Sequence, residues 1–213
     1  MQVRLALCRT DSECLDLRRT NALFSPERLA RISRRPVQGQ REAAAGQLLL
    51  RALLEETLPG VAFPPRLVYN GQDKPILADY PELWFNISHS GGWAVCALCA
   101  APVGADLQLR RPIPPGIVRK FALSERKLLE KLPESEQNSA ACDLWSLKEA
   151  YSKCTGEGLR VPLNRAAFTL DPVRVSVPGY TALLLPGPEA GYSLAVCAET
   201  EQPLEVLVRE LPF

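Results

Sequence analysis

The side chains with the clearest capacity for chemistry lie in residues 145–158, Trp-Ser-Leu-Lys-Glu-Ala-Tyr-Ser-Lys-Cys-Thr-Gly-Glu-Gly. At about 100° per residue, a helix places Trp145, Glu149 and Lys153 on one face. The apolar side chains on the opposite arc are Leu144, Leu147, Tyr151 and Cys154. A carboxylate and an ammonium one turn apart can form the wall of a cleft for a metal ion and a phosphate. The alternative is an i,i+4 glutamate–lysine pair on a solvated face, worth about 0.2–0.5 kcal/mol, and this segment alone does not decide between the two.

A second group of oxygen-bearing side chains lies in residues 103–108, Val-Gly-Ala-Asp-Leu-Gln. In a strand, Asp106 and Gln108 share one face because side chains alternate. Carboxylate and amide oxygens suit a hard cation such as Mg²⁺, which completes its octahedron with water and phosphate. The alternative is a partly exposed strand with ordinary polar alternation.

A third group, Asn-Ile-Ser-His-Ser-Gly at residues 86–91, carries the only histidine of the chain. His89 lies between two serines and close to two glycines, in a predicted turn whose backbone N–H groups can point at an anion. A single histidine is also commonly a structural residue, so both interpretations stay open.

Taken together, these groups indicate phosphoryl chemistry, in which catalysis is mainly positioning and charge neutralisation. Asp106 and Glu149 can supply two carboxylates to one metal ion, and Lys153 and His89 can face the oxygens of a polyphosphate. Basic side chains upstream suit a second, separate phosphate, although each alone also fits a solvated helix face. They are Arg28, Arg31, Arg41 and Lys74.

The elements that position these residues follow from hydrophobic periodicity and capping signals. Strands are expected at residues 3–8, 67–69, 84–88, 94–100, 103–108, 168–170, 173–177, 181–185 and 192–198. Helices are expected after Asp11 or Ser12 towards residue 21, from Ser25-Pro26-Glu27 until Pro36, at 38–58, near 118, at 124–132 and at 139–155. Ser124 is expected to cap its helix, beside Glu125, and Gly156 and Gly158 to end the last one.

Both halves of the chain show the order strand, helices, long helix, antiparallel strands. This order predicts an α+β fold made of a pseudo-twofold pair of similar subdomains, each with a long helix packed on a small antiparallel sheet. The expected domains are residues 1–103 and 104–213, so the polar groups flank their junction.

Composition narrows the classes of partner. The 213 residues are 46% hydrophobic, and 25 basic against 24 acidic residues leave a net charge of +1, which argues against nucleic-acid or membrane-surface binding. We expect no signal peptide and no membrane span. Seven cysteines, an odd number, favour reduced thiols in a cytoplasmic protein, with Cys96-x-x-Cys99 in an apolar core rather than at a zinc ion.

Five motifs in this order and spacing resemble those of the surfactin-synthetase-activating (Sfp) type of 4'-phosphopantetheinyl transferase. They are Asn70-Gly71-x-x-Lys74-Pro75, Phe85-Asn-Ile-Ser-His-Ser90, Val103-Gly-Ala-Asp106, Phe121-x-x-x-Glu125 and Trp145-Ser-x-Lys-Glu-Ala-x-x-Lys153-x-x-Gly156-x-Gly158. The likeness runs from about residue 25 to residue 170. Single motifs are weak signals, but five in register are specific.

The resemblance implies a holo-[carrier protein] synthase. Such an enzyme transfers the 4'-phosphopantetheine arm of coenzyme A to a serine of an apo acyl or peptidyl carrier protein, as in secondary-metabolite biosynthesis, and releases adenosine 3',5'-bisphosphate. The implied fold is a pseudo-twofold pair of α+β halves with the active site between them. One internal cleft is compatible with a monomer, which we expect.

The resemblance also implies roles for single residues. Asp106 and Glu149 would bind Mg²⁺, and Glu149 would help to remove the proton of the attacking serine. Lys153 and His89 would hold phosphate oxygens, and Ser88 and Lys74 would contact coenzyme A. Arg28, Arg31 and, less firmly, Arg41 would lie near the adenosine 3'-phosphate, and Glu125 near the metal or Lys148.

The chain departs from the family pattern at Gln108, where many relatives carry an acid. We expect the amide carbonyl or a water to be the third metal ligand, and weaker Mg²⁺ binding than an acid would give. Two other functions are kept open: a non-catalytic module that binds coenzyme A or a carrier protein, and a metal-dependent pyrophosphatase.

Overall fold

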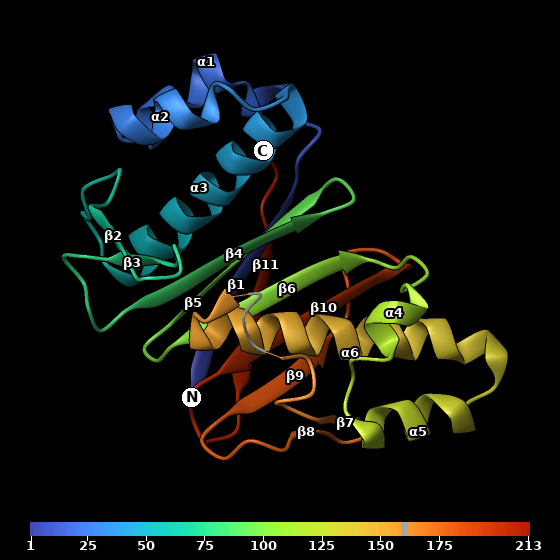
Figure 1. The fold of residues 1–213 in the computed structure, drawn as a ribbon. Helices are drawn as coiled ribbons and strands as arrows, with labels where there is room; N and C mark the ends of the chain where they lie inside the picture. Colours follow the sequence, from blue (N-terminus) through green and yellow to red (C-terminus); the bar gives the residue numbers. More distant parts are fainter. Residues whose placement is uncertain (159–161) are drawn as a thin grey trace.

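The computed structural model describes residues 1–158 and 162–213. Two sheets lie between two long helices, α3 (Val37–Thr57) and α6 (Glu134–Thr155) (Figure 1). The first sheet has the strand order β11 (Glu205–Glu210), β1 (Gln2–Arg9), β5 (Trp93–Cys99), β4 (Trp84–Ser90). The second has the order β6 (Val103–Leu109), β10 (Tyr192–Ala198), β9 (Thr181–Leu185).

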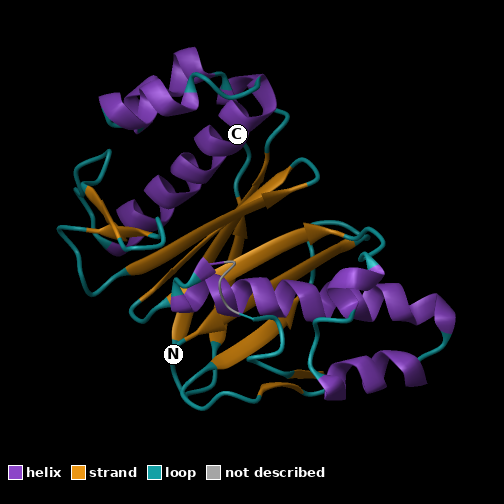
Figure 2. Cartoon of the chain, in the orientation of Figure 1, coloured by secondary structure: helices purple, strands orange, loops and turns teal. Residues whose placement is uncertain are grey.

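Shorter elements complete the fold (Figure 2). Two hairpins pair β2 (Leu67–Tyr69) with β3 (Pro75–Leu77), and β7 (Phe168–Leu170) with β8 (Val173–Val175). The short helices are η1 (Glu13–Leu15), α1 (Leu17–Thr20), η2 (Asn21–Leu23), α2 (Pro26–Ile32), α4 (Pro115–Val118) and α5 (Leu123–Lys131). None of the helices within the described residues has the length and apolarity to cross a bilayer.

In the described residues, three hydrophobic cores fill the spaces between the helices and the sheets. One lies between α3 and the first sheet, one between the two sheets, and one between the second sheet and α6. Strand β5 is buried along its whole length because its even-numbered residues face α3 and its odd-numbered residues face the second sheet. Cys96 and Cys99 therefore belong to different cores, which confirms their interpretation as core residues and separates them as possible ligands of one metal.

Several capping predictions are confirmed. Ser25 is the N-cap of α2, and Gly156 ends α6 in the left-handed conformation, with φ = 72°. The apolar arc of α6 is buried as expected, with Leu144 and Leu147 fully inaccessible. The helix itself begins at Glu134, five residues before the predicted start, directly after Pro133.

Other local predictions are wrong. The stretch after Asp11 does not form one helix, because Ser12 and Asp16 cap η1 and α1 separately. Ser124 is not the N-cap of α5: the helix begins at Leu123, and the Glu125 carboxylate accepts the N–H of the N-cap residue, Ala122, at 2.8 Å.

The last strand corrects the expected antiparallel sheet of the first half. β11 was not predicted, and it runs parallel to β1, so this sheet is mixed and contains a strand from residues 104–213. The division into residues 1–103 and 104–213 and the pseudo-twofold relation between the halves stay predictions.

The two sheets meet where β4 passes β6, and side chains join them there. Alternate side chains on one face of β4 accept hydrogen bonds from alternate backbone N–H groups of β6. The pairs are Asn86 Oδ1 with Ala105 N (2.9 Å), Ser88 Oγ with Leu107 N (3.3 Å) and Ser90 Oγ with Leu109 N (3.0 Å). We call this set the β4–β6 junction.

Helix α6 lies directly on β6 at Gly104. A Cβ atom at this position would overlap the carbonyl oxygen of Ala150 and the amide nitrogen of Cys154, which are main-chain atoms of the helix. Only glycine lets the helix come this close, and this approach sets the distance between α6 and β6.

We predict that Gly104→Ala lowers the free energy of unfolding by about 3 kcal/mol or more, because the helix backbone cannot move aside without repacking the core. Gly116→Ala is the matched control, since the nearest atom to its Cβ is 3.7 Å away. Its helix propensity should change stability by about 1 kcal/mol or less. Urea unfolding measures both, and equal stabilities for the two variants would contradict the close approach.

Candidate active site

Asp106 is the centre of a polar cluster at the β4–β6 junction. It is only 5% exposed, and Lys153 Nζ on α6 lies 2.6 Å from its Oδ1. Ser88 Oγ donates to the same Oδ1 at 3.2 Å and accepts from Lys153 Nζ at 2.9 Å. Strand, facing strand and helix thus each contribute one member of a hydrogen-bonded triangle.

The second oxygen of Asp106 is free for another ligand. Oδ2 is buried and has no hydrogen-bond partner among the described residues. A buried carboxylate oxygen without a donor is costly, so its position fits a cation. Gln108 follows on the same face of β6, and its Nε2 donates to the Leu109 carbonyl at 3.1 Å. The chemistry of these oxygens fits Mg²⁺, which binds oxygen ligands and keeps several waters.

Glu149 lies one helical turn from Lys153 and is half-buried. Burial raises the pKa of its carboxyl group; the Lys153 ammonium opposes the rise and the Asp106 carboxylate adds to it. Within the described residues, Lys153 forms its ion pair with Asp106 and not with Glu149. The simple i,i+4 pair is therefore not what this helix contains. Glu149 and Trp145 line a cavity of about 320 Å³.

Lys148, the residue before Glu149, points the other way, into the core. It is 4% exposed and forms a buried ion pair with Glu125 at 2.7 Å, and Glu125 is fully inaccessible. The remaining partners are backbone groups: Lys148 Nζ donates to Leu163 O (2.6 Å) and Ala166 O (2.9 Å), and Glu125 accepts from Ala122 N and Phe168 N (2.8 Å each). Glu125 thus lies beside Lys148, one of its two predicted positions, and this pair fixes the rotation of α6.

His89 lies on the opposite face of β4 from Ser88, because neighbouring strand residues alternate. Its Nδ1 is 3.2 Å from Glu42 Oε2 on α3. The structure therefore separates His89 from Lys153 and brings it to a cavity of about 190 Å³ with the basic residues of α2. That cavity is lined by Arg28, Arg31, Arg35, Glu42, Asn86 and His89.

Arg28 has an unused donor beside this cavity. Its Nη1 is buried without a hydrogen-bond partner among the described residues, and burial lowers the pKa of the guanidinium. A larger cavity, of about 690 Å³, also includes Arg28 and Arg31 and extends to Gln47 and Tyr69. Unpaired buried guanidinium donors are typical of anion sites.

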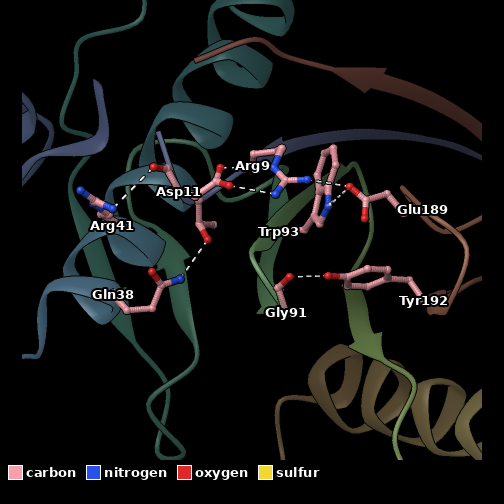
Figure 3. Close-up of polar contacts among 9 residues, drawn as sticks. Arg9, Asp11, Gln38, Arg41, Gly91, Trp93, Glu189 and Tyr192 are labelled. Atoms are coloured by element: carbon pink, nitrogen blue, oxygen red, sulfur yellow. Dashed lines mark hydrogen bonds and ion pairs between the residues drawn. The ribbon is translucent and has the colours of Figure 1, made fainter. Parts of the chain in front are cut away.

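Arg41 and Lys74 lie apart from both clusters. Arg41 points to the backbone carbonyl of Asp11, 3.5 Å away (Figure 3). Lys74 is 8% exposed, and its ammonium donates to the carbonyl oxygens of Val103 and Cys154. Their predicted contacts with the coenzyme stay predictions.

A second contact joins the two halves near the turn that follows β4. The Arg9 guanidinium bridges Asp11 and Glu189, at 2.8 and 2.7 Å, and Trp93 Nε1 donates to Glu189 at 3.2 Å (Figure 3). Tyr192 donates its hydroxyl hydrogen to the Gly91 carbonyl. The Gly91 carbonyl of this turn thus serves the interface, and the predicted contact of the turn's N–H groups with an anion stays a prediction.

Sequence reasoning missed the structural role of Asn86, Ser90 and Arg110. The period-two spacing of polar residues along β4 was the signal for the first two. Arg110, at the end of β6, donates to Asp143 at 2.7 Å and to Ser139 on α6, a long-range arrangement without a local pattern.

A buried carboxylate paired with a half-buried ammonium, with a basic cavity elsewhere on β4, is an arrangement that suits a phosphate-containing substrate. Residues 102–197 match the model of the 4'-phosphopantetheinyl transferase superfamily. The 4'-phosphopantetheinyl transferase psf-1 of Bacillus pumilus is 34% identical over 172 residues, which are 74% of this chain and 70% of that protein.

Two further relatives give the same result. The 4'-phosphopantetheinyl transferase Sfp of Bacillus subtilis (strain 168) is 32% identical over 72% of this chain and 71% of its own length. The 4'-phosphopantetheinyl transferase HetI of Nostoc sp. (strain PCC 7120) is 34% identical over 73% of this chain and 68% of its own length. The chain belongs to the 4'-phosphopantetheinyl transferase family, and is an enzyme of that class.

We predict that Lys148→Met lowers the free energy of unfolding by about 3–5 kcal/mol, because it leaves the buried Glu125 carboxylate without its cation. The double variant with Glu125→Gln should lose less than the sum of the single losses. Lys127→Met, an exposed change on α5, is the control and should change stability by about 0.5 kcal/mol or less. Urea unfolding tests this, and additive losses would argue against a coupled pair.

Proposed function

We propose that this chain catalyses the Mg²⁺-dependent transfer of the 4'-phosphopantetheine arm of coenzyme A to a serine of an apo acyl or peptidyl carrier protein. The other product is adenosine 3',5'-bisphosphate. The observation that carries the proposal is Asp106, a buried carboxylate with one oxygen held by Lys153 and Ser88 and the other without a hydrogen-bond partner in the part of the chain that the structure describes.

The donor set supports a resident Mg²⁺. Asp106 Oδ2, the Glu149 carboxylate and the Gln108 amide oxygen are the residues that would hold it, directly or through water. When bound, the ion neutralises charge on the pyrophosphate and polarises the phosphoryl group. With Gln108 in place of an acid, the site offers one negative charge fewer.

Side chains of the protein provide the charge stabilisation and the proton transfer. Lys153 holds a positive charge where phosphate oxygens gain negative charge during transfer. Glu149 accepts the proton of the carrier serine as its oxygen attacks the β phosphorus. The bond from that phosphorus to the bridging oxygen breaks, and adenosine 3',5'-bisphosphate leaves with the electron pair. The transferred arm ends as a phosphodiester on the serine.

The basic cavity beside α2 supports binding of the other end of the coenzyme. Arg28 and Arg31 suit the adenosine 3'-phosphate, since Arg28 has a buried donor that meets no acceptor among the described residues, and His89 lines the same cavity. Ser88 and His89 are neighbours that face different sides of β4, so one strand connects the phosphate-rich ends of a single extended substrate.

The test is incubation with coenzyme A, Mg²⁺ and an apo carrier protein, followed by mass spectrometry of the carrier and analysis of the nucleotide. Transfer gives a carrier heavier by one phosphopantetheine group. Release of bisphosphate without carrier indicates a pyrophosphatase instead, and binding of coenzyme A without either product indicates a binding module. A panel of carriers from peptide, polyketide and fatty-acid synthesis identifies the acceptor.

We predict that Glu149→Gln and Asp106→Asn each reduce kcat/KM for carrier modification by about 10²-fold or more, because each removes a charged oxygen ligand of the metal and Glu149→Gln also removes the proton acceptor. Glu136→Gln is the matched control, an exposed change at the other end of α6 that should leave the rate unchanged. Full activity of either site variant would contradict the assigned roles.

Gln108 allows a gain-of-function prediction. Gln108→Glu should lower the Mg²⁺ concentration for half-maximal activity about tenfold, because it adds a charged ligand. Gln202→Glu adds the same charge at an exposed position outside the site. A metal titration in which both variants match the parent chain would remove residue 108 from the metal site.

A further inference from the structure

The turn between β2 and β3 reaches from the first half of the chain to the C-terminal end of α6. Asn70 Nδ2 donates to the Gly156 carbonyl at 3.2 Å. Lys74 Nζ donates to the Cys154 carbonyl at 2.9 Å and to the Val103 carbonyl at 3.3 Å. The turn therefore links the last turn of α6 to the start of β6.

Asn70 also builds the turn that presents Lys74. Its Oδ1 accepts the N–H groups of Gln72 and Lys74, each at 2.9 Å, and its own backbone N–H donates to the Lys74 carbonyl at 3.1 Å. The two ends of this amide thus have separate tasks: the oxygen shapes the turn, and the nitrogen contacts the helix.

The contacts satisfy a physical need of the helix. The last carbonyls of a helix lack intrahelical partners and form the negative end of its dipole, where a cation is stabilising. Among the described residues, Lys74 donates to two backbone carbonyls, Cys154 at the helix end and Val103 at the start of β6, and the Trp84 ring lies 5.6 Å from its ammonium. Gly156 fits the arrangement, since a Cβ there would come within 2.8 Å of Asn70 Nδ2 and 3.0 Å of Lys74 Cδ.

Lys153 is the residue directly before the carbonyl that Lys74 holds. Its ammonium donates to Ala105 O at 3.3 Å as well as to Ser88 and Asp106, so a shift of the last helical turn would move it from all three. On this basis, and resting on the proposed function, we propose that Asn70 and Lys74 are positioning residues for the transfer. They hold the end of α6 so that Lys153 stays at Asp106.

This role differs from direct contact with coenzyme A and gives a different kinetic signature. Loss of a coenzyme contact raises KM for coenzyme A and leaves kcat unchanged. Displacement of Lys153 lowers kcat, because a misplaced charge stabilises the transition state less. The two roles are therefore separable in one kinetic experiment.

The experiment compares Asn70→Asp, Lys74→Met and the double variant with Arg51→Met as control. Asn70→Asp keeps the oxygen that shapes the turn and replaces the donor to Gly156 with a second carboxylate oxygen, so it carries the test even where Lys74→Met does not fold. Arg51 is an exposed cation on α3 that pairs with Glu55. Steady-state kinetics with coenzyme A and carrier, and hydrogen exchange of amides 152–156, are measured for each.

We expect kcat to fall about ten- to a hundredfold in both single variants, with KM for coenzyme A changed less than about threefold. The double variant should lose less than the product of the single effects, since both residues act on one helix end. Exchange at amides 152–156 should rise about tenfold, and Arg51→Met should match the parent chain in every measurement.

A higher KM with unchanged kcat would overturn the proposal in favour of a coenzyme contact, as would unchanged exchange at the end of α6. The exchange measurement needs no activity. If the parent chain modifies no carrier, the proposed function fails, and the catalytic role of these residues fails with it. Exchange rates at the helix end then decide alone whether the turn holds α6.

Discussion

The hydrogen bonds at the β4–β6 junction are the constraint on which the rest of the structure depends. Backbone N–H groups of β6 need acceptors, and β4 supplies them from side chains instead of its own carbonyls. Side chains therefore stand between the two sheets. One of them, Ser88, both joins the sheets and belongs to the candidate site, since its hydroxyl accepts from Leu107 N and donates to Asp106. The joint between the two sheets and the candidate site therefore share the Ser88 hydroxyl.

Helix α6 adds the charged side chains that complete the candidate site at this joint. Three neighbouring charged residues leave it in different directions: Lys148 into the core against Glu125, Lys153 towards Asp106, and Glu149 to a half-buried position between them. The buried pair fixes the rotation of the helix, and Gly104 fixes its distance from β6. A buried ion pair with every partner satisfied gives rigidity and geometric definition more than net stability. Rigidity is what phosphoryl transfer requires, because it depends on placed charges.

The sequence predicted the parts of the fold that local patterns encode. Periodicity located the long helices, the strands around the junction and the buried arc of α6, and capping residues located Ser25 and Gly156. It did not predict β11 or β3, because a short edge strand is stabilised by the strand it joins, far away in the chain. Local sequence patterns also do not predict which charged side chains pair. Lys153 pairs across the junction with Asp106 rather than with its helical neighbour Glu149, and Lys148 is buried with Glu125. Tertiary packing determines both pairs. The expected strand ended at residue 88, so the sequence did not apply strand alternation to His89, whereas β4 continues to Ser90 and places Ser88 and His89 on opposite faces.

The central claim is that one site at the β4–β6 junction holds the metal ion and the pyrophosphate of coenzyme A. Its most direct test is a crystal structure of the protein grown with coenzyme A and Mn²⁺ in place of Mg²⁺, with the anomalous signal locating the metal. The account predicts a metal peak bonded to the Asp106 carboxylate, pyrophosphate oxygens at Lys153, and the adenosine end towards Arg28. A metal peak and coenzyme away from Asp106 and Glu149 would contradict it.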